Sequence, residues 1–222
     1  MLERLYVLPI LLFSVVIHEI SHGYMALKLG DPTAKLEGRL TLNPLPHIDP
    51  VGSVLVPLFS LIVAGQVFIA WAKPVPINPL NFQNYRRDDI LVSVVGPFSN
   101  LAVALGCTVM VVLLLNVAPL FQLDSPGAVG DGLEFLVRML HAGIFLNIVL
   151  AVFNLLPIPP LDGSHVVASL LPPEFAEGYR RIGFFGIFVI LVLMRMPAFK
   201  SAFLSIVVSL AAPYEFMIFM FT

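Results

Sequence analysis

Residues 5–27 read LYVLPILLFSVVIHEISHGYMAL, an apolar run with three ionisable side chains near its end. About 20 apolar residues are enough for a helix to cross the hydrocarbon core of a bilayer. The whole 222-residue chain is 59% hydrophobic and only 12% charged, whereas a soluble domain is nearer half apolar and a quarter charged. The composition therefore predicts an integral membrane protein. It excludes a disordered chain, a coiled coil and a basic nucleic-acid-binding domain.

Four further apolar runs are interpreted as crossing helices, at 90–116, 135–156, 182–197 and 201–221. Their apolar residues are continuous rather than alternating, which disfavours a transmembrane β-barrel. The predicted fold is an all-α polytopic membrane protein with about five transmembrane helices. The first run resembles a signal peptide, but it does not end in a small-residue cleavage site, so we interpret it as the first membrane helix.

The charges between these runs predict the topology. Lysine and arginine occur in the segments 28–50, 73–89 and 157–181, whereas the segment 117–132 holds two aspartates and no basic residue. The positive-inside rule places the three basic segments in the cytoplasm, and the acidic segment and the N-terminus outside. A further apolar run at 51–72 then has both flanks on one side, so we expect it to be a re-entrant segment rather than a full crossing.

The pattern H-E-x-x-H occurs at residues 18–22 as HEISH. On a helix, His18 and His22 share one face and can bind one zinc ion, and Glu19 lies beside that face, where it can take a proton from a zinc-bound water. A chance match is the alternative interpretation. Inside a membrane helix, however, each ionisable side chain costs about 2.5–3.5 kcal/mol at the centre, so a bound metal explains the pattern better.

A catalytic zinc ion needs a third protein ligand. The acidic candidates in or next to apolar runs are Asp162 and Glu215. Asp162 follows a proline-rich break after the 135–156 run, and by itself it would be an ordinary turn aspartate before Gly163. Together with HEISH inside the membrane, it is the preferred third ligand, whereas Glu215 is expected at a membrane interface.

Three motifs occur together: HEISHG at 18–23, Gly96-Pro97 followed by Asn100, and NLLPIPPLDG at 154–163. In combination they resemble the site-2 protease family of intramembrane zinc metalloproteases. The stretches GRLTLNPLPHIDPVGS and WAKPVPINPLNF look like the compact bacterial branch of that family. No PDZ domain is evident between the motifs.

The resemblance implies an activity and a role for each motif residue. The activity is hydrolysis of a peptide bond within or beside a transmembrane helix of a substrate protein, with Zn²⁺ as the cofactor. His18, His22 and Asp162 correspond to the zinc ligands, and Glu19 corresponds to the catalytic base. Asn154 corresponds to the asparagine that helps to hold the substrate or to stabilise the oxyanion, as an amide donor can do.

We expect one integral membrane protease domain over residues 1–222, with a catalytic core at about 5–170 and C-terminal helices at 182–221. The expected partners are a transmembrane protein substrate and the lipid bilayer, with no nucleic acid, and the oligomeric state is left open. The expected location is the cell membrane, as a multi-pass protein of the bacterial plasma membrane. The alternatives are a metal-ion-binding membrane transporter and a catalytically inactive membrane scaffold. Glu19 argues against the transporter, which needs no base between its ligands.

The remaining polar and small residues are interpreted without catalytic roles. His47 is expected in a loop, His141 as a packed or interface residue, and His165 in a turn. The run RRDD at 86–89 is interpreted as a solvated helix start at the membrane surface. Gly96 and Gly106 are expected to allow close contact between helices.

Overall fold

The computed structural model describes residues 6–55, 72–121, 127–183 and 185–222, and within these ranges the chain is helical and contains no strand. Four helices are long: α1 (Val7–Lys28), α4 (Tyr85–Val117), α5 (Ala128–Asn154) and α9 (Pro197–Phe221). Four are shorter: α2 (Thr33–Leu36), α6 (Asp162–Leu170), α7 (Pro173–Arg180) and α8 (Phe185–Arg195). Single turns of 3₁₀ or π helix lie at Leu45–His47, Pro50–Leu55, Pro79–Asn81 and Pro119–Phe121.

Four segments of the described chain are long and apolar enough to cross a membrane: Val7–Lys28, Tyr85–Phe121, Val129–Asn154 and Pro197–Phe221. The prediction of an all-α polytopic membrane protein is confirmed. The fifth expected helix, at 182–197, is shorter than predicted. Its helical part, α8, has 11 residues, fewer than the roughly 20 that a crossing needs. A new helix begins directly afterwards, with Pro197 at its first position, where proline is favoured.

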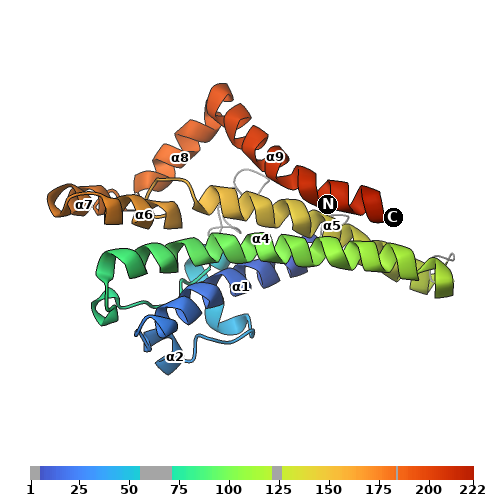
Figure 1. The fold of residues 1–222 in the computed structure, drawn as a ribbon, viewed down its shortest axis with the longest axis horizontal. Coiled ribbons are helices and arrows are strands. Elements are labelled where there is room, and N and C mark those ends of the chain that lie inside the picture. The colour runs from blue at the N-terminus through green and yellow to red at the C-terminus, as the bar shows by residue number, and fades with distance from the viewer. Residues whose placement is uncertain (1–5, 56–71, 122–126, 184) are drawn as a thin grey trace.

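The central helix of the molecule is α4 (Figure 1). It contacts α1, α5, α6 and α9. Both α1 and α5 run antiparallel to α4, so the C-terminal ends of α1 and α5 lie at the same end of the bundle as the start of α4 (Figure 1). The short helices α6 and α7 follow α5 at this end, while α8 and α9 form an inverted V above α5 in the view of Figure 1.

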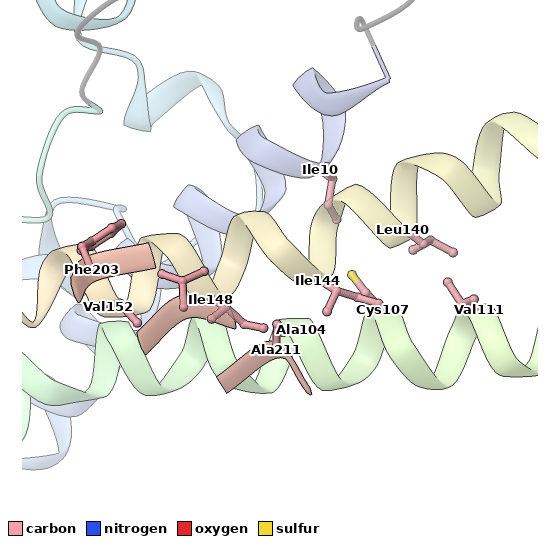
Figure 2. Close-up of a cluster of buried hydrophobic side chains, with 11 residues drawn as sticks. Ile10, Ala104, Cys107, Val111, Leu140, Ile144, Ile148, Val152, Phe203 and Ala211 are labelled. Carbon is pink, nitrogen blue, oxygen red and sulfur yellow. The ribbon is translucent and has the colours of Figure 1, made fainter. Parts of the chain in front are cut away.

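An apolar core holds α1, α4, α5 and α9 together (Figure 2). Ile144 and Ile148 of α5 and Val207 of α9 are completely buried in it. Since lipid tails are as apolar as these side chains, close packing rather than water exclusion is what holds such helices together in a membrane. Packing in this core fixes the positions of α1, α4 and α5 relative to one another. It thereby determines which of their polar side chains meet in the part of the bundle near the start of α4.

The end of α1 and the approach to α4 are tied to each other by Asp31. Its carboxylate accepts hydrogen bonds from the backbone N of Asn78 and from Asn81 Nδ2, both at 2.7 Å. The segment between the two helices therefore begins and ends on one side of the bundle. The prediction of a re-entrant path for 51–72 falls mainly on residues 56–71, which lie outside the described residues.

Candidate metal centre

Three predicted ligands meet where α1, α4 and α6 come together. Asp162 Oδ2 lies 3.1 Å from His18 Nε2 and 3.4 Å from His22 Nε2, and the two Nε2 atoms are 3.1 Å apart. The possible ligand atoms of the three residues all lie within 4.8 Å of one another. In the described part of the chain, no other three His, Cys, Asp or Glu residues form such a group.

The outer ring nitrogens of both histidines are hydrogen-bonded to α4. His22 Nδ1 donates to the carbonyl oxygen of Val92 at 2.7 Å, and His18 Nδ1 donates to Asn100 Oδ1 at 2.6 Å. A carbonyl oxygen can only accept, so each Nδ1 carries the proton and each neutral ring keeps a lone pair on Nε2. Both unprotonated nitrogens therefore lie beside the carboxylate of Asp162.

In their neutral form, with Nδ1 protonated, the two rings present only acceptors to the carboxylate of Asp162. Among the described residues, Asp162 Oδ2 is buried and has no hydrogen-bond partner. A buried anion in such surroundings is costly unless a cation compensates it. Two imidazoles and one carboxylate form the kind of donor set found in catalytic zinc sites. The residues present thus fit a zinc ion.

A buried polar network fixes the orientation of Asn100. Its Nδ2 donates to Asn147 Oδ1 of α5 at 2.9 Å, and Asn147 Nδ2 donates to Ser14 Oγ of α1 at 2.8 Å. This leaves Asn100 Oδ1 facing His18. From the sequence, Asn100 was noted only as part of a motif, and Asn147 and Ser14 were not predicted. The signal that could have found Asn147 is a side-chain amide inside an apolar helix, where it needs a partner on another helix.

Gly96 lets α4 approach the two histidines. A Cβ atom at this position would lie 2.3 Å from His22 Nε2 and 2.8 Å from His18 Cε1, far closer than van der Waals contact allows. The expected close approach of helices is therefore confirmed at Gly96. It is wrong at Gly106, where an added Cβ atom would meet nothing within 4 Å.

Asp162 owes its position to the tight connection between α5 and α6. It is the first residue of α6. The next residue, Gly163, packs on the end of α5, where an added Cβ atom would lie 2.2 Å from the carbonyl oxygen of Leu155. Farther along α6, Ser169 Oγ donates to Asp89 Oδ2 of α4 at 2.7 Å. Helix α4 thus contacts the elements that carry all three candidate ligands.

The two remaining predicted site residues have different surroundings. Glu19 is half-buried, and its Oε2 accepts a hydrogen bond of 2.8 Å from the backbone N of Val75. Asn154 is the last residue of α5, and its Nδ2 donates to the carbonyl oxygen of Leu150 at 3.0 Å. The role of Asn154 in holding substrate stays a prediction.

The interpretation of residues 86–89 as a solvated helix start is wrong for its two aspartates. Asp88 and Asp89 are buried, with 2% and 6% of their surfaces exposed. Helix α6 packs against α4, and Asp88 Oδ2 accepts a hydrogen bond of 2.9 Å from the backbone N of Asn84. Asp89 lies 3.6 Å from Arg180 Nη2 of α7 and 3.4 Å from His165 Nδ1. His165 lies within α6, so the prediction that it lies in a turn is wrong.

The other two histidines lie away from the metal centre. His47 ends a 3₁₀ turn in the connection between α2 and α4, as expected of a loop residue, but it is buried and its Nε2 donates to the carbonyl oxygen of Thr41 at 3.0 Å. His141 of α5 is half-exposed and lies 3.2 Å from Glu215 Oε1 of α9. Glu215 therefore lies away from the candidate metal centre. This agrees with the preference for Asp162 over Glu215 as the third ligand.

Fold and site together define a polytopic membrane protein in which two buried histidines and a partly buried aspartate meet, with a glutamate beside them. The family model described as Peptidase family M50 matches residues 78–194, a range that includes Asp162 and helices α4, α5 and α6. The chain belongs to this family, the site-2 protease family of zinc metalloproteases. Its cofactor is zinc, and it is a multi-pass membrane protein.

Curated relatives from bacteria agree with this membership. The chain is 38% identical to the "Putative zinc metalloprotease YwhC" of Bacillus subtilis over 192 residues, which cover 86% of this chain and 81% of the relative. It is 30% identical to the "Putative zinc metalloprotease Rip2" of Mycolicibacterium smegmatis over 196 residues, which cover 88% of this chain and 69% of that protein. No solved structure matches the chain.

Proposed function

We propose that this chain hydrolyses peptide bonds within or beside transmembrane helices of membrane proteins, at a zinc ion held by His18, His22 and Asp162. The observation that carries the proposal is the convergence of these three side chains inside a helical membrane protein, with Asp162 Oδ2 buried and without a hydrogen-bond partner among the described residues. Membership of a zinc metalloprotease family supports the same chemistry.

Each side chain has a defined task in this mechanism. When bound, zinc lowers the pKa of its water toward about 7 and polarises the carbonyl group under attack. The Nε2 atoms of His18 and His22 and the carboxylate of Asp162 hold the ion. The Glu19 carboxylate accepts the proton of the attacking water and passes it to the leaving amine, as a general base that becomes a general acid.

Asn154 is proposed to contact the substrate. One amide hydrogen of its Nδ2 is used by the carbonyl oxygen of Leu150, and an asparagine amide has a second hydrogen to donate. A donor at the end of α5, eight residues before Asp162 in the sequence, can bind a substrate carbonyl or the oxyanion that develops from it.

A substrate helix must unwind locally before it can be cut. The backbone carbonyls of a transmembrane helix are bonded within the helix, because the bilayer offers them no other partner. Residues that weaken the helix, such as glycine, asparagine or proline near the scissile bond, should therefore favour cleavage. The substrate class is a membrane protein with such a weakened segment.

We further propose that the chain is a single protease domain in the bacterial plasma membrane. The catalytic core at about 5–170 includes every candidate site residue, and the C-terminal helices at 182–221 pack against it through α9. The basic segments around the metal centre favour the cytoplasmic side for the active site. The relatives named above are bacterial proteins, which supports the choice of membrane.

The test compares cells that produce the wild-type chain with cells that produce Glu19→Gln. Glutamine has nearly the shape of glutamate but cannot accept the proton, so zinc should be retained and activity should fall by roughly 10²–10⁴-fold or more. Quantitative proteomics of the membranes should show fragments that end inside or beside transmembrane segments only with the wild type. Equal fragments from both strains, at equal zinc content, would contradict the proposal and the enzymatic role of Glu19.

A further inference from the structure

The segment 73–78, which we call the strap, lies across the helix that carries the candidate base. Its sequence is KPVPIN. The backbone N of Val75 donates to Glu19 Oε2, and the Val75 side chain packs on α1 one turn farther along. A Cβ atom on Gly23 would lie 2.9 Å from Val75 Cγ1. Because Glu19 and Gly23 share one face of the helix, the strap contacts α1 over the face of the base.

The strap is held firmly on both sides of Val75. Arg39 is buried, with 5% of its surface exposed, and its Nη2 donates to the carbonyl oxygens of Lys73 and Pro74 at 2.9 and 3.2 Å. At the other end, the backbone N of Asn78 donates to the buried carboxylate of Asp31 at 2.7 Å. Burying a charged guanidinium group costs free energy, and here the buried group holds two carbonyl oxygens of the strap. This indicates that the position of the strap matters.

The sequence of the strap leaves it one backbone donor at this point. Pro74 and Pro76 have no N–H group, so Val75 supplies the single N–H among these three residues. That N–H donates its hydrogen bond to Glu19 Oε2. A hydrogen bond from a neutral amide to a carboxylate is charge-assisted and directional, so it can fix the rotation of the carboxylate without placing a competing charge beside the zinc site.

We propose that the Val75 amide is the group that positions the Glu19 carboxylate for catalysis, and that Arg39 is a positioning residue that acts through the strap. This inference rests on the proposed function of Glu19 as the base. With Oε2 held by the strap, the carboxylate presents its other oxygen in one orientation. Arg39 contributes by holding the carbonyl oxygens of Lys73 and Pro74, and the Pro74 carbonyl belongs to the same peptide unit as the Val75 N–H.

The contact itself is tested by NMR of the full chain in detergent micelles. Labelling proline with ¹³C at the carbonyl and valine with ¹⁵N selects two amide signals, because Val51 and Val75 are the only valines that follow a proline. In Glu19→Ala, the Val75 amide proton should shift upfield and exchange faster with solvent, whereas Val51 serves as the internal reference. An unchanged Val75 signal would overturn the proposal, whatever the activity of the protein.

The catalytic consequence is tested with two matched variants at position 75. Val75→Pro removes the N–H and should lower kcat by roughly 10-fold or more, as part of the contribution of a well-placed base, with KM within about twofold and zinc content unchanged. Val75→Ala keeps the N–H and also loses the packing of the valine side chain on α1, so its kcat should stay well above that of Val75→Pro. Equal kcat values for zinc-loaded Val75→Pro and Val75→Ala would overturn the proposal.

Arg39 provides a second pair if Val75→Pro does not fold. Arg39→Met removes the donor to the strap and should lower kcat with little change in KM, and Arg39→Lys, which keeps a donor, should restore part of the loss. Equal kcat in both Arg39 variants would also contradict the positioning role. If Glu19→Gln is inactive while Val75→Pro is fully active, only the positioning proposal fails; if both are active, the proposed function itself fails.

Discussion

At the scale of single residues, the candidate metal centre depends on one buried carboxylate oxygen. Asp162 Oδ2 lies beside the Nε2 atoms of His18 and His22 and has no hydrogen-bond partner in the described part of the chain. Removing it with Asp162→Ala leaves two protein ligands, fewer than a catalytic zinc site uses. We expect metal analysis to find about one zinc per chain in the wild type and a large loss in Asp162→Ala. The control is His141→Ala, and full zinc retention by Asp162→Ala would exclude this residue as the third ligand.

Asn100 should matter for zinc although it does not touch the ion. It accepts the Nδ1 hydrogen of His18, and such partners orient a ligating histidine. Losing one typically costs 10–100-fold in metal affinity, so we expect a loss of about that size for Asn100→Leu. Asn100→Asp keeps an acceptor and should retain more affinity. Competition with a chelator measures both variants, and an unchanged affinity in Asn100→Leu would show that the bond is dispensable.

Site residues in a local sequence motif could be predicted, whereas contacts between distant segments could not. His18, Glu19 and His22 follow from a local rule, because residues four apart share a helix face. Asp162 was preferred as the third ligand because it follows a proline-rich break next to an apolar run, and the resemblance of NLLPIPPLDG to a known family supported that choice. The pairing of Asn100 with His18 and the bond between Val75 and Glu19 depend on how distant segments pack, and the spacing of residues in the sequence does not contain that register.

At the scale of helices, the contact between α1 and α4 depends on one missing side chain. Gly96→Ala places a methyl group where His22 Nε2 lies, and such overpacking typically costs 1–3 kcal/mol. We expect this variant to lose zinc and to unfold at a lower temperature. Gly106→Ala, on the same helix, should change neither zinc content nor melting temperature. Normal zinc binding by Gly96→Ala would mean that the two helices stand farther apart.

The connection after α1 should be sensitive to acid. Burial acts to raise the pKa of Asp31, but hydrogen bonds from Thr33, Asn81 and Asn78 outweigh it and lower the pKa below its usual value. A depressed folded-state pKa stabilises the fold above the unfolded value, about 3.9, and that contribution is lost as the pH falls through the folded value. The difference in melting temperature between the wild type and Asp31→Asn should therefore shrink below about pH 4. A difference independent of pH would contradict this account.

Helix boundaries were predicted well where the apolar run was uninterrupted. They were predicted poorly where tertiary structure determines where a helix begins or ends. The runs at 90–116 and 135–156 became the inner parts of α4 and α5. The run at 182–197 became a short helix, α8, which ends at Arg195 before Pro197 begins α9. Near its start, Gly186 packs on the connection that leads to Asp162. A Cβ atom there would lie 1.6 Å from the carbonyl oxygen of Pro159. Hydropathy cannot report such a contact.

At the scale of the whole molecule, the direction of the helices constrains the topology. The ends of α1 and α5 and the start of α4 share one end of the bundle (Figure 1), and Asp31 ties the first of these to the last through Asn78 and Asn81. An odd number of full crossings between α1 and α4 would separate them. The positive-inside rule independently puts both flanks of 51–72 on the cytoplasmic side.

Single-cysteine labelling of intact cells tests this topology in a Cys107→Ala background. Exposed positions are available on both sides: Lys35 and Asn84 at the end of the metal centre, and Asp131 at the opposite end. A membrane-impermeant thiol reagent should label Asp131→Cys from outside and should leave Lys35→Cys and Asn84→Cys unlabelled. External labelling of Asn84→Cys alone would require a different path between α1 and α4.

The length of α4 also has a consequence for hydration. With 33 residues, it is about 50 Å long, against a hydrocarbon thickness of roughly 30 Å, and its charged turns at 86–89 belong outside the apolar layer. Val92 and Asn100, which contact the two histidines, stand roughly 10 and 22 Å from its start along the helix axis. The candidate site thus lies between the midplane and the membrane surface near the start of α4. Water needs only a short path to reach it, and a substrate helix must bring its scissile bond toward that surface.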